Sequence, residues 1–497
     1  MRNIMKIKSK VIFLSAMCSV SYAFCADPVQ DQNLINEHIP QLQDKTEIAA
    51  PSLSKGVQSA SQYEQQIKKI TDEDLKQNIK LTNFVVNQAV IQQDWKTLRR
   101  IIQFYNQIPG YDPILYDYVR GAIYRQDGQH KQAIKLYRNI VEQHPDLSYM
   151  RLDLAAMLFE NRAYNDSQTE FERVLKDDIV PNARTKAQAY LSALRQQDRW
   201  KSKVAVSYGY NSNINNATNN KYLYIPIGTS GYYWILTRDA ESLPQSGHVA
   251  GLSFSTNKDY NVQGNHFINL SVDSNANIVK EHREFNDANV TLSATYKYQD
   301  IDSWLEVGPW VNRANYHLND IGKLDSIGFS TQYGHWLTPK WQMIVSSNAL
   351  TRKYDNPSYS AAYDGETYIF STVLARVISP RFVVYANLGV QKDDLSNKNE
   401  SSKRFSSLLG VNYGFKNGIQ TSLSTSYAYR KFDGISVWTG YNRKDDEYQI
   451  NASLWKQDLK FWGITPKFLV KLSKTDSNVY VNEKDKREFL IRFEKDI

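Results

Sequence analysis

The side chains that could do covalent chemistry form no recognisable catalytic set in this sequence. A hydrolytic site pairs a nucleophile with a histidine and an acid, and short motifs usually mark these residues. No such motif accompanies the histidines of the second half, which are His248, His266, His282, His317 and His335. Isolated histidines in strands or loops more often serve as polar lumen or interface residues. The sequence therefore predicts no catalytic residue, and we expect the protein not to be an enzyme.

Residues with metal-binding chemistry are equally scattered. Cys18 and Cys25, the two cysteines, lie in or at the edge of an N-terminal leader, so the remaining chain has one thiol at most and no internal disulfide. The eight histidines show no His-x-x-x-His spacing. Acidic loops at 393–394 and 445–447 offer oxygen ligands for Ca²⁺, but solvated charge is the simpler interpretation. We expect no metal site and no cofactor.

The chain begins with a predicted export signal at residues 1–23, ahead of the elements that could position a site. Four basic residues and no acid occur in residues 1–10, and an apolar segment at 11–20 is too short to span a bilayer. Small residues at 21–23 place the expected cleavage after Ala23, with cleavage after residue 25 or 26 as the alternative. The protein is therefore expected to leave the cytoplasm.

The charge distribution argues against nucleic acid as a partner. The chain of 497 residues carries a net charge of +8, but four of its positive charges lie in the leader. Beyond the leader, Lys and Arg are interspersed with Asp and Glu rather than gathered in a stripe. No later apolar run is long enough for a transmembrane helix.

Composition and periodicity divide the rest of the chain into three parts. Residues 27–60 are polar, contain three prolines and show little periodicity, which indicates a flexible linker. Residues 61–198 have apolar positions at helical spacing. After Trp200 the pattern changes to alternation, and Ser, Asn, Gly, Tyr and Val become frequent. We therefore expect an α+β multidomain chain with a domain boundary near residue 200.

A 34-residue repeat lies within the helical part. The signature positions 8, 11, 20, 24 and 32 of a tetratricopeptide repeat (TPR) are occupied by Gly121, Tyr124, Ala133, Tyr137 and Pro145. The same frame, shifted by one repeat, contains Ala155, Leu158, Ser167, Phe171 and Ile179. Small residues at positions 8 and 20 let two antiparallel helices approach, and the aromatic at 24 fills the space between them. The sequence predicts an all-α TPR solenoid over 61–198.

Such a solenoid is either a spacer or a peptide-binding groove. We favour a groove, because repeat arrays on exported proteins rarely serve only as spacers. The residues expected to face a client there are Tyr118, Arg125, Tyr149 and Phe159.

The last part, residues 200–497, predicts a transmembrane β-barrel. Runs of about ten residues alternate apolar and polar side chains, the length that crosses an outer membrane at a tilt. We place fourteen strands, beginning near residues 201, 247, 266, 288, 304, 325, 341, 366, 382, 405, 419, 447, 466 and 487. Every second connection is short, and the intervening ones are longer and polar. An even strand number puts both barrel ends on the short-turn side, which is periplasmic in bacterial barrels. The helical domain is expected on the same side.

The stretch Tyr-Gly-Tyr-Asn-Ser-Asn-Ile-Asn-Asn at 208–216, directly after the repeats, resembles the first barrel strand of the surface lipoprotein assembly modulator (Slam) family. The resemblance covers the architecture from about residue 80 to the end. It implies a periplasmic repeat domain, a fourteen-stranded outer-membrane barrel and no catalytic residues. It also implies a role in moving particular lipoproteins, or soluble haem-binding proteins, from the periplasm to the cell surface. Many clients of that family capture host iron or haem.

We therefore expect a translocation helper in the outer membrane of a Gram-negative cell. Its repeats would receive the client, and its barrel would offer a route through the lumen or along the seam where strands one and fourteen meet. Expected partners are the surface lipoprotein or secreted haem- or iron-binding client, periplasmic chaperones, the barrel assembly machinery and outer-membrane lipid. The alternative is a TPR-linked porin for exopolysaccharide export, and a plain diffusion porin is a third option. The client, the oligomeric state and the position of loop 217–246 are left open.

Overall fold

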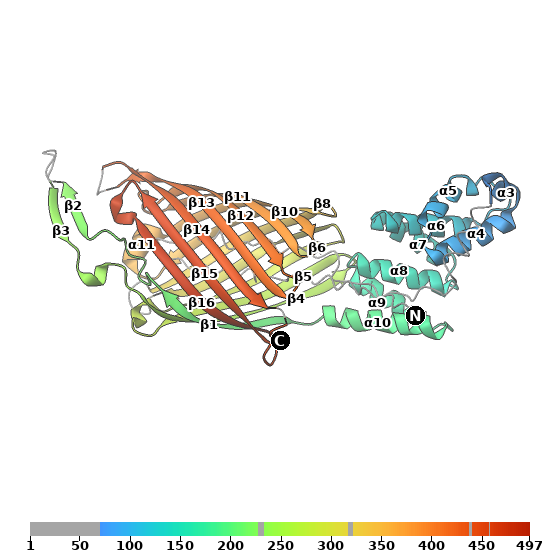
Figure 1. Ribbon diagram of the computed structural model, residues 1–497, viewed down its shortest axis with the longest axis horizontal. Coiled ribbons are helices and arrows are strands. Elements are labelled where there is room, and N and C mark those ends of the chain that lie inside the picture. Colours follow the sequence, from blue (N-terminus) through green and yellow to red (C-terminus); the bar gives the residue numbers. More distant parts are fainter. Residues whose placement is uncertain (1–69, 227–232, 317–321, 437–439, 457) are drawn as a thin grey trace.

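The computed structural model describes residues 70–226, 233–316, 322–436, 440–456 and 458–497. The expected signal peptide at 1–23, the linker at 27–60 and the first residues of the expected helical domain lie outside this part of the chain. Figure 1 shows helices at one end, a closed barrel in the middle and a hairpin that projects from the opposite end. The predicted order of a helical domain followed by a barrel is confirmed.

Antiparallel helices follow one another through the first domain. They are α3 (Asp72–Gln77), α4 (Ile79–Gln92), α5 (Trp95–Tyr105), α6 (Pro113–Gln126), α7 (His130–Gln143), α8 (Ser148–Glu160), α9 (Tyr164–Val174) and α10 (Pro181–Gln197). Local sequence sets several of their starts. Thr71 and Asp74 form a reciprocal capping box at α3, and Asp112 caps α6, where Pro113 occupies the first helical position.

The repeat packing follows the residue types at the signature positions. Gly121 of α6 lies against the ring of Tyr137 in α7, and a β-carbon at Gly121 would lie only 2.2 Å from Tyr137 Cε2. In the next repeat Ala155, Ser167 and Phe171 are completely buried, and the Ser167 hydroxyl donates to the Ala155 carbonyl at 2.8 Å. The expectation that small residues bring the helices together around an aromatic side chain is confirmed.

Fourteen antiparallel strands close into the barrel. They are β1 (Lys201–Asn211), β4 (Gly247–Gln263), β5 (His266–Val279), β6 (Asp287–Gln299), β7 (Ser303–Tyr316), β8 (Gly322–Thr338), β9 (Trp341–Tyr354), β10 (Gly365–Ser379), β11 (Phe382–Leu395), β12 (Ser402–Gly414), β13 (Ile419–Ile435), β14 (Asn442–Lys456), β15 (Ile464–Ser477) and β16 (Lys484–Asp496). Each strand pairs with its neighbours in sequence order, and β1 pairs with both β4 and β16. The predicted strand number and closure are confirmed.

The alternating sequence separates an apolar outer face from a polar inner face. On β1, Val206 and Tyr208 are about half exposed on the outside, whereas Ala205 and Asn211 are buried on the inside. On β12, Phe405 and Leu409 face outward in the same way, with exposed fractions of 58% and 63%. A band of apolar side chains around a closed sheet suits bilayer hydrocarbon, because closure leaves no backbone hydrogen-bonding group without a partner.

The two ends of the barrel differ. Tight turns connect β4 to β5, β6 to β7 and β8 to β9, and the helical domain lies at this short-turn end (Figure 1). The long-loop end carries the helix α11 (Pro357–Tyr363) and the paired strands β2 (Tyr222–Pro226) and β3 (Tyr233–Thr237). Figure 1 shows that β2 and β3 extend away from the barrel rather than into it. Within the described ranges, no helix is both long and apolar enough to cross a membrane.

Candidate functional site: the helical polar row, the domain junction and the barrel lumen

Half-buried polar side chains from α6, α8 and α10 meet on one face of the helical domain. The Tyr118 hydroxyl of α6 donates to Asp153 Oδ2 of α8 at 2.9 Å. Burial, together with the nearby Asp153 carboxylate, raises the pKa of Tyr118 above its ordinary value. Tyr118 therefore keeps its proton and acts as a hydrogen-bond donor at neutral pH.

An ion pair links the same two helices one turn further along. Arg125 Nε donates to Glu160 Oε2 at 2.9 Å, and its Nη2 contacts Oε1, so the pair is made at two points. Burial alone would lower the pKa of Arg125, but Glu160 raises it above its ordinary value. Lys186 of α10 is half-buried beside these groups, and its burial lowers the pKa of its ammonium. We name Tyr118, Arg125, Asp153, Glu160 and Lys186 the polar row.

The four residues expected to face a client have different surroundings. Tyr118 and Arg125 belong to the polar row. Tyr149 is 54% exposed and shares a face of α8 with Asp153, four residues further on. Phe159 is only 2% exposed and packs between Tyr164 and Tyr190 in the core, so its expected place on the binding face is wrong.

The helical domain contacts the barrel at the short turn between β4 and β5. The amides of Asn161 and Asn265 hydrogen-bond across this junction. The Asn165 backbone N–H donates to Asn261 Oδ1 at 2.8 Å, and its side-chain amide donates to the Asn261 carbonyl at 2.7 Å. The ring of Tyr164 covers Phe267, which is only 1% exposed. Polar and aromatic contacts thus fix the start of α9 at the barrel mouth.

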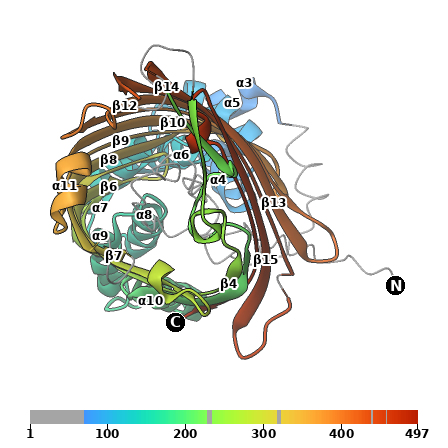
Figure 2. The same cartoon turned by 90° about the vertical axis from the view of Figure 1, so that its left-hand side faces the viewer.

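A second contact is made at the turn between β6 and β7. Lys131 Nζ of α7 lies 3.0 Å from Asp300 Oδ2, and Asp300 also accepts the backbone N–H groups of Asp302 and Ser303. Burial opposes ionisation of Asp300, but these donors hold its pKa below its ordinary value. Figure 2, a view along the barrel, shows α8 and α9 behind the barrel opening. Figure 1 shows the same helices next to the short-turn end of the barrel.

On one side of the barrel, buried ion pairs join the inward side chains of different strands. Asp393 of β11 is completely buried and accepts from Arg352 Nη2 at 3.1 Å and from Arg430 Nη2 at 2.8 Å. Arg404 of β12 donates to Glu447 Oε2 of β14 at 2.8 Å, and both side chains are nearly inaccessible. Buried ion pairs with this many partners cost several kcal/mol to break, so this side of the wall is rigid.

The wall near β1 and β16 is more open. Arg492 of β16 has 34% of its side chain exposed and donates to Ser253 of β4 at 3.0 Å, and Lys486 and Glu488 also retain access to solvent. The seam between β1 and β16 contains nine residue pairs, fewer than any other neighbouring pair of barrel strands in the described part of the chain. The seam is therefore the least extensively paired line in the barrel.

Comparison with known proteins identifies the architecture. Residues 200–497 match the family described as surface lipoprotein assembly modifier, and residues 68–171 match the N-terminal TPR repeats of that family. The chain belongs to the surface lipoprotein assembly modifier family. It is accordingly an outer-membrane protein, and the predicted TPR fold of its helical domain is confirmed.

Members of the family from several bacteria are similar to the chain over most of its length. Surface lipoprotein assembly modifier 1 of Haemophilus influenzae is 24% identical over 467 residues, which cover 92% of this chain and 93% of the relative. The surface lipoprotein assembly modifier of Pasteurella multocida is 24% identical over 506 residues, with 98% and 96% covered. The hemophilin secretion modulator of Acinetobacter baumannii is 23% identical over 403 residues, with 79% and 80% covered.

Three residues of the polar row were not predicted from the sequence, although the spacing of two of them indicates their position. Asp153 and Glu160 lie 35 residues after Tyr118 and Arg125, which is the length of one tetratricopeptide repeat plus one residue. That spacing places both pairs on adjacent first helices. Lys186 lies beyond the matched repeats, on α10, and the sequence gives no comparable sign of its position.

Proposed function

We propose that this outer-membrane protein delivers particular lipoproteins, or soluble haem- or iron-capturing proteins, from the periplasm to the cell surface. The helical domain lies in the periplasm and receives the client, and the barrel provides the route across the membrane. No catalytic residue takes part. The names of the relatives support both client classes, since they refer to surface lipoproteins and to hemophilin.

The observation that carries the proposal is the attachment of the TPR domain to the barrel mouth. Hydrogen bonds from Asn161 and Asn165 and the ion pair from Lys131 hold the repeats at the short-turn end. A polypeptide bound at the polar row would lie next to the opening that it must enter. A plain pore needs no domain of this kind.

The polar row suits an extended polypeptide as the bound ligand. Its acidic and basic side chains are only partly buried: those of Arg125 and Glu160 are 31% and 16% exposed. Tyr149 offers an exposed ring beside them. Tyr and Arg are among the residue types that contribute most to protein interfaces. We place Tyr118, Arg125 and Tyr149 at the client contact.

For a lipidated client, the route follows the seam between β1 and β16. Acyl chains entering the lumen would meet Arg492, Lys486 and Glu488, whereas an opened seam would keep them in hydrocarbon. Periplasmic chaperones would deliver the client, and the barrel assembly machinery would insert the barrel itself.

The proposal is tested by deleting residues 61–195 and measuring surface display of a co-expressed lipoprotein encoded next to this protein. The leader and barrel remain, and heat-modifiable gel migration checks that the barrel is assembled. Display should fall to the level seen without the protein. Normal display by an assembled, truncated barrel would show that the receiving role is wrong. Export of a polysaccharide instead of the lipoprotein would favour the alternative porin function.

A further inference from the structure

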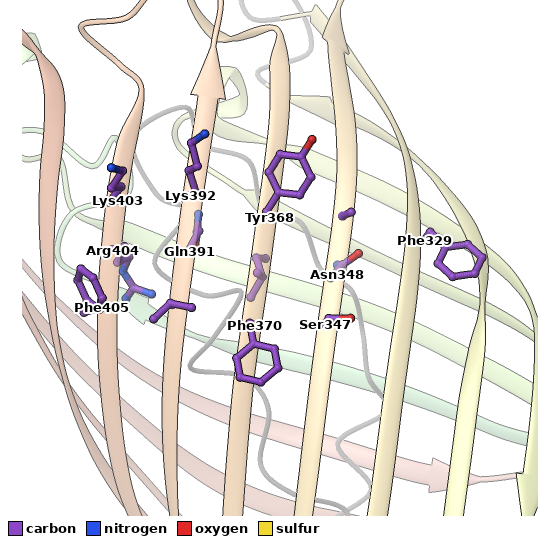
Figure 3. A pocket seen from close by; sticks show the side chains of 13 residues that line it. Phe329, Ser347, Asn348, Tyr368, Phe370, Gln391, Lys392, Lys403, Arg404 and Phe405 are labelled. Carbon is purple, nitrogen blue, oxygen red and sulfur yellow. The ribbon is translucent and has the colours of Figure 1, made fainter.

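The outer wall of the barrel has a pocket that spans strands β8 to β12 and encloses about 630 Å³. This is within the range of about 300–1,000 Å³ that is typical of small-molecule sites. Phe329 of β8 and Phe370 of β10 flank two small residues of β9, Ser347 and Ala349. Phe370 pairs with Ser347 and Phe329 pairs with Ala349, so a strand with short side chains runs between two aromatic flanks. Phe405 of β12 adds a further exposed ring (Figure 3).

Four lysines lie side by side at the long-loop end of the same wall. Lys392 pairs with Lys403, Lys403 with Lys431, and Lys431 with Lys444, on the consecutive strands β11, β12, β13 and β14. Directly paired residues point to the same face of a sheet, and this face is the outer one. Strands about 4.8 Å apart spread the four lysines over roughly 14 Å. We name them the lysine row.

The pocket and the lysine row are continuous. Lys392 and Lys403 line the pocket, and Figure 3 shows both above Phe370 and Phe405. The arrangement places positive charge at the membrane surface and apolar side chains deeper in the wall.

Charge in the row is largely uncompensated. Lys392 Nζ lies 3.9 Å from Asp394 Oδ2, and Asp394 is also bound by Lys398. Within the described residues, no carboxylate lies within ion-pair distance of Lys403, Lys431 or Lys444. Lys474, an outward lysine of β15, is paired in contrast: its Nζ lies 2.7 Å from Asp476 Oδ1. Like charges directly opposite one another destabilise a sheet unless something between them is negative.

We propose that the pocket and the lysine row bind a bisphosphorylated, acylated glycolipid of the outer leaflet, which is the lipid A class. The lysines bind the phosphates, and the pocket takes an acyl chain. The inference rests on the proposed orientation, in which the long loops face outward.

The span of the row favours this lipid over an ordinary phospholipid. A phospholipid has a single phosphodiester and can engage one or two ammonium groups. Four ammonium groups spread over roughly 14 Å match a headgroup with two separated phosphates. An apolar ligand without phosphate would use the pocket but leave the lysines unpaired.

The test measures lipid binding to the full-length protein purified in neutral detergent, by native mass spectrometry. Four probes are compared: hexa-acylated lipid A with two phosphates, its monophosphoryl form, phosphatidylglycerol and a triacylated lipopeptide. The wild type should bind bisphosphorylated lipid A most tightly. Glutamine at all four lysines (Lys392→Gln, Lys403→Gln, Lys431→Gln, Lys444→Gln) should weaken that binding at least a hundredfold, because the substitutions remove every charge-assisted contact from the row to the phosphates.

Two further variants keep the test decisive. Lys474→Gln removes an outward lysine that is already paired and should leave binding within twofold of wild type. Ser347→Leu with Ala349→Leu fills the pocket with apolar side chains that a lipid-facing wall tolerates, and should weaken lipid A binding about tenfold. Heat-modifiable migration confirms that each barrel is folded. Equal binding by wild type and the four-lysine variant, or equal affinity for phosphatidylglycerol or the lipopeptide, would overturn the proposal.

The orientation of the barrel in the outer membrane is measured in a separate experiment. A wrong orientation can then be distinguished from a failure to bind lipid A. With Cys25→Ser to remove the native thiol, a single cysteine at Ser396→Cys, in the loop after β11, should react with a membrane-impermeant maleimide on intact cells. Labelling supports an outer-leaflet site. Labelling only after the outer membrane is permeabilised would overturn the proposed orientation, and with it the assignment to lipid A, whatever the purified protein binds.

Discussion

At the scale of single residues, side-chain size and burial explain where sequence reasoning succeeded and where it failed. Gly121 was expected to let two helices meet, and the ring of Tyr137 occupies the space that a side chain would need. Phe159 was expected on the binding face but lies in the core. Helix α8 is buried on nearly every side from Leu154 to Phe159, so apolar spacing could not distinguish its core face from its client face.

Gly121→Val should destabilise the helical domain by about 1–3 kcal/mol, because the added methyl groups overlap the Tyr137 ring and force the helices apart. Thermal unfolding followed by far-ultraviolet circular dichroism at the helix minimum should show an earlier helical transition. Barrel migration on unheated gels should not change. Ala122→Val, at the neighbouring half-buried position, is the matched control. An unchanged helical transition in Gly121→Val would contradict the packing described here.

The ion pair between Lys131 and Asp300 has a defined pH dependence. Because the folded protein holds the pKa of Asp300 below its ordinary value of about 3.9, the pair contributes above that value. The contribution disappears only as the pH falls through the lowered pKa. Spin labels at Glu172→Cys and Lys340→Cys, in a Cys25→Ser background, should therefore give a narrow distance distribution from pH 7 down to pH 4 when Asp300 is present. Asp300→Asn should broaden it at every pH, and a wild type that resembled this variant at pH 4 would refute the prediction.

At the scale of elements, alternation located every barrel strand, with starts within five residues of those observed. The largest difference is at β14, expected from residue 447 but starting at Asn442. Its first residues are Asn, Arg, Lys and two Asp, which extend past the hydrocarbon, where no apolar face is required. The hairpin of β2 and β3 was not predicted, because short strands within a long polar loop give too few alternating positions to detect.

The seam between β1 and β16 gives a prediction at the scale of elements. A disulfide between Tyr208→Cys and Ile491→Cys, which are directly paired across the seam, should reduce display of a lipidated client at least tenfold. Reductant should restore it. The control disulfide, Tyr427→Cys with Tyr448→Cys, joins β13 to β14 and should have no effect. If the client is displayed at normal levels while the seam disulfide is formed, the route lies in the lumen.

At the scale of the whole molecule, the order of domains and the loop lengths were readable from sequence, but the junction between the domains was not. Asn161, Asn165, Asn261 and Asn265 are ordinary turn residues in sequence. Their pairing spans about one hundred positions and depends on how both domains fold. The polar row is similar, because Lys186 joins it only through the packing of α10 against α8.

The central claim is that the polar-row face of the TPR domain receives the client. Its most direct test is photo-crosslinking in cells that co-express the candidate lipoprotein, with a photoreactive amino acid in place of Tyr149, beside the row. The same group in place of Glu172, an exposed residue of the second helix of the repeat, is the control. We predict a crosslink to the client from position 149 and none from position 172. Normal client display without a crosslink at 149, or equal crosslinking from both positions, would contradict the account.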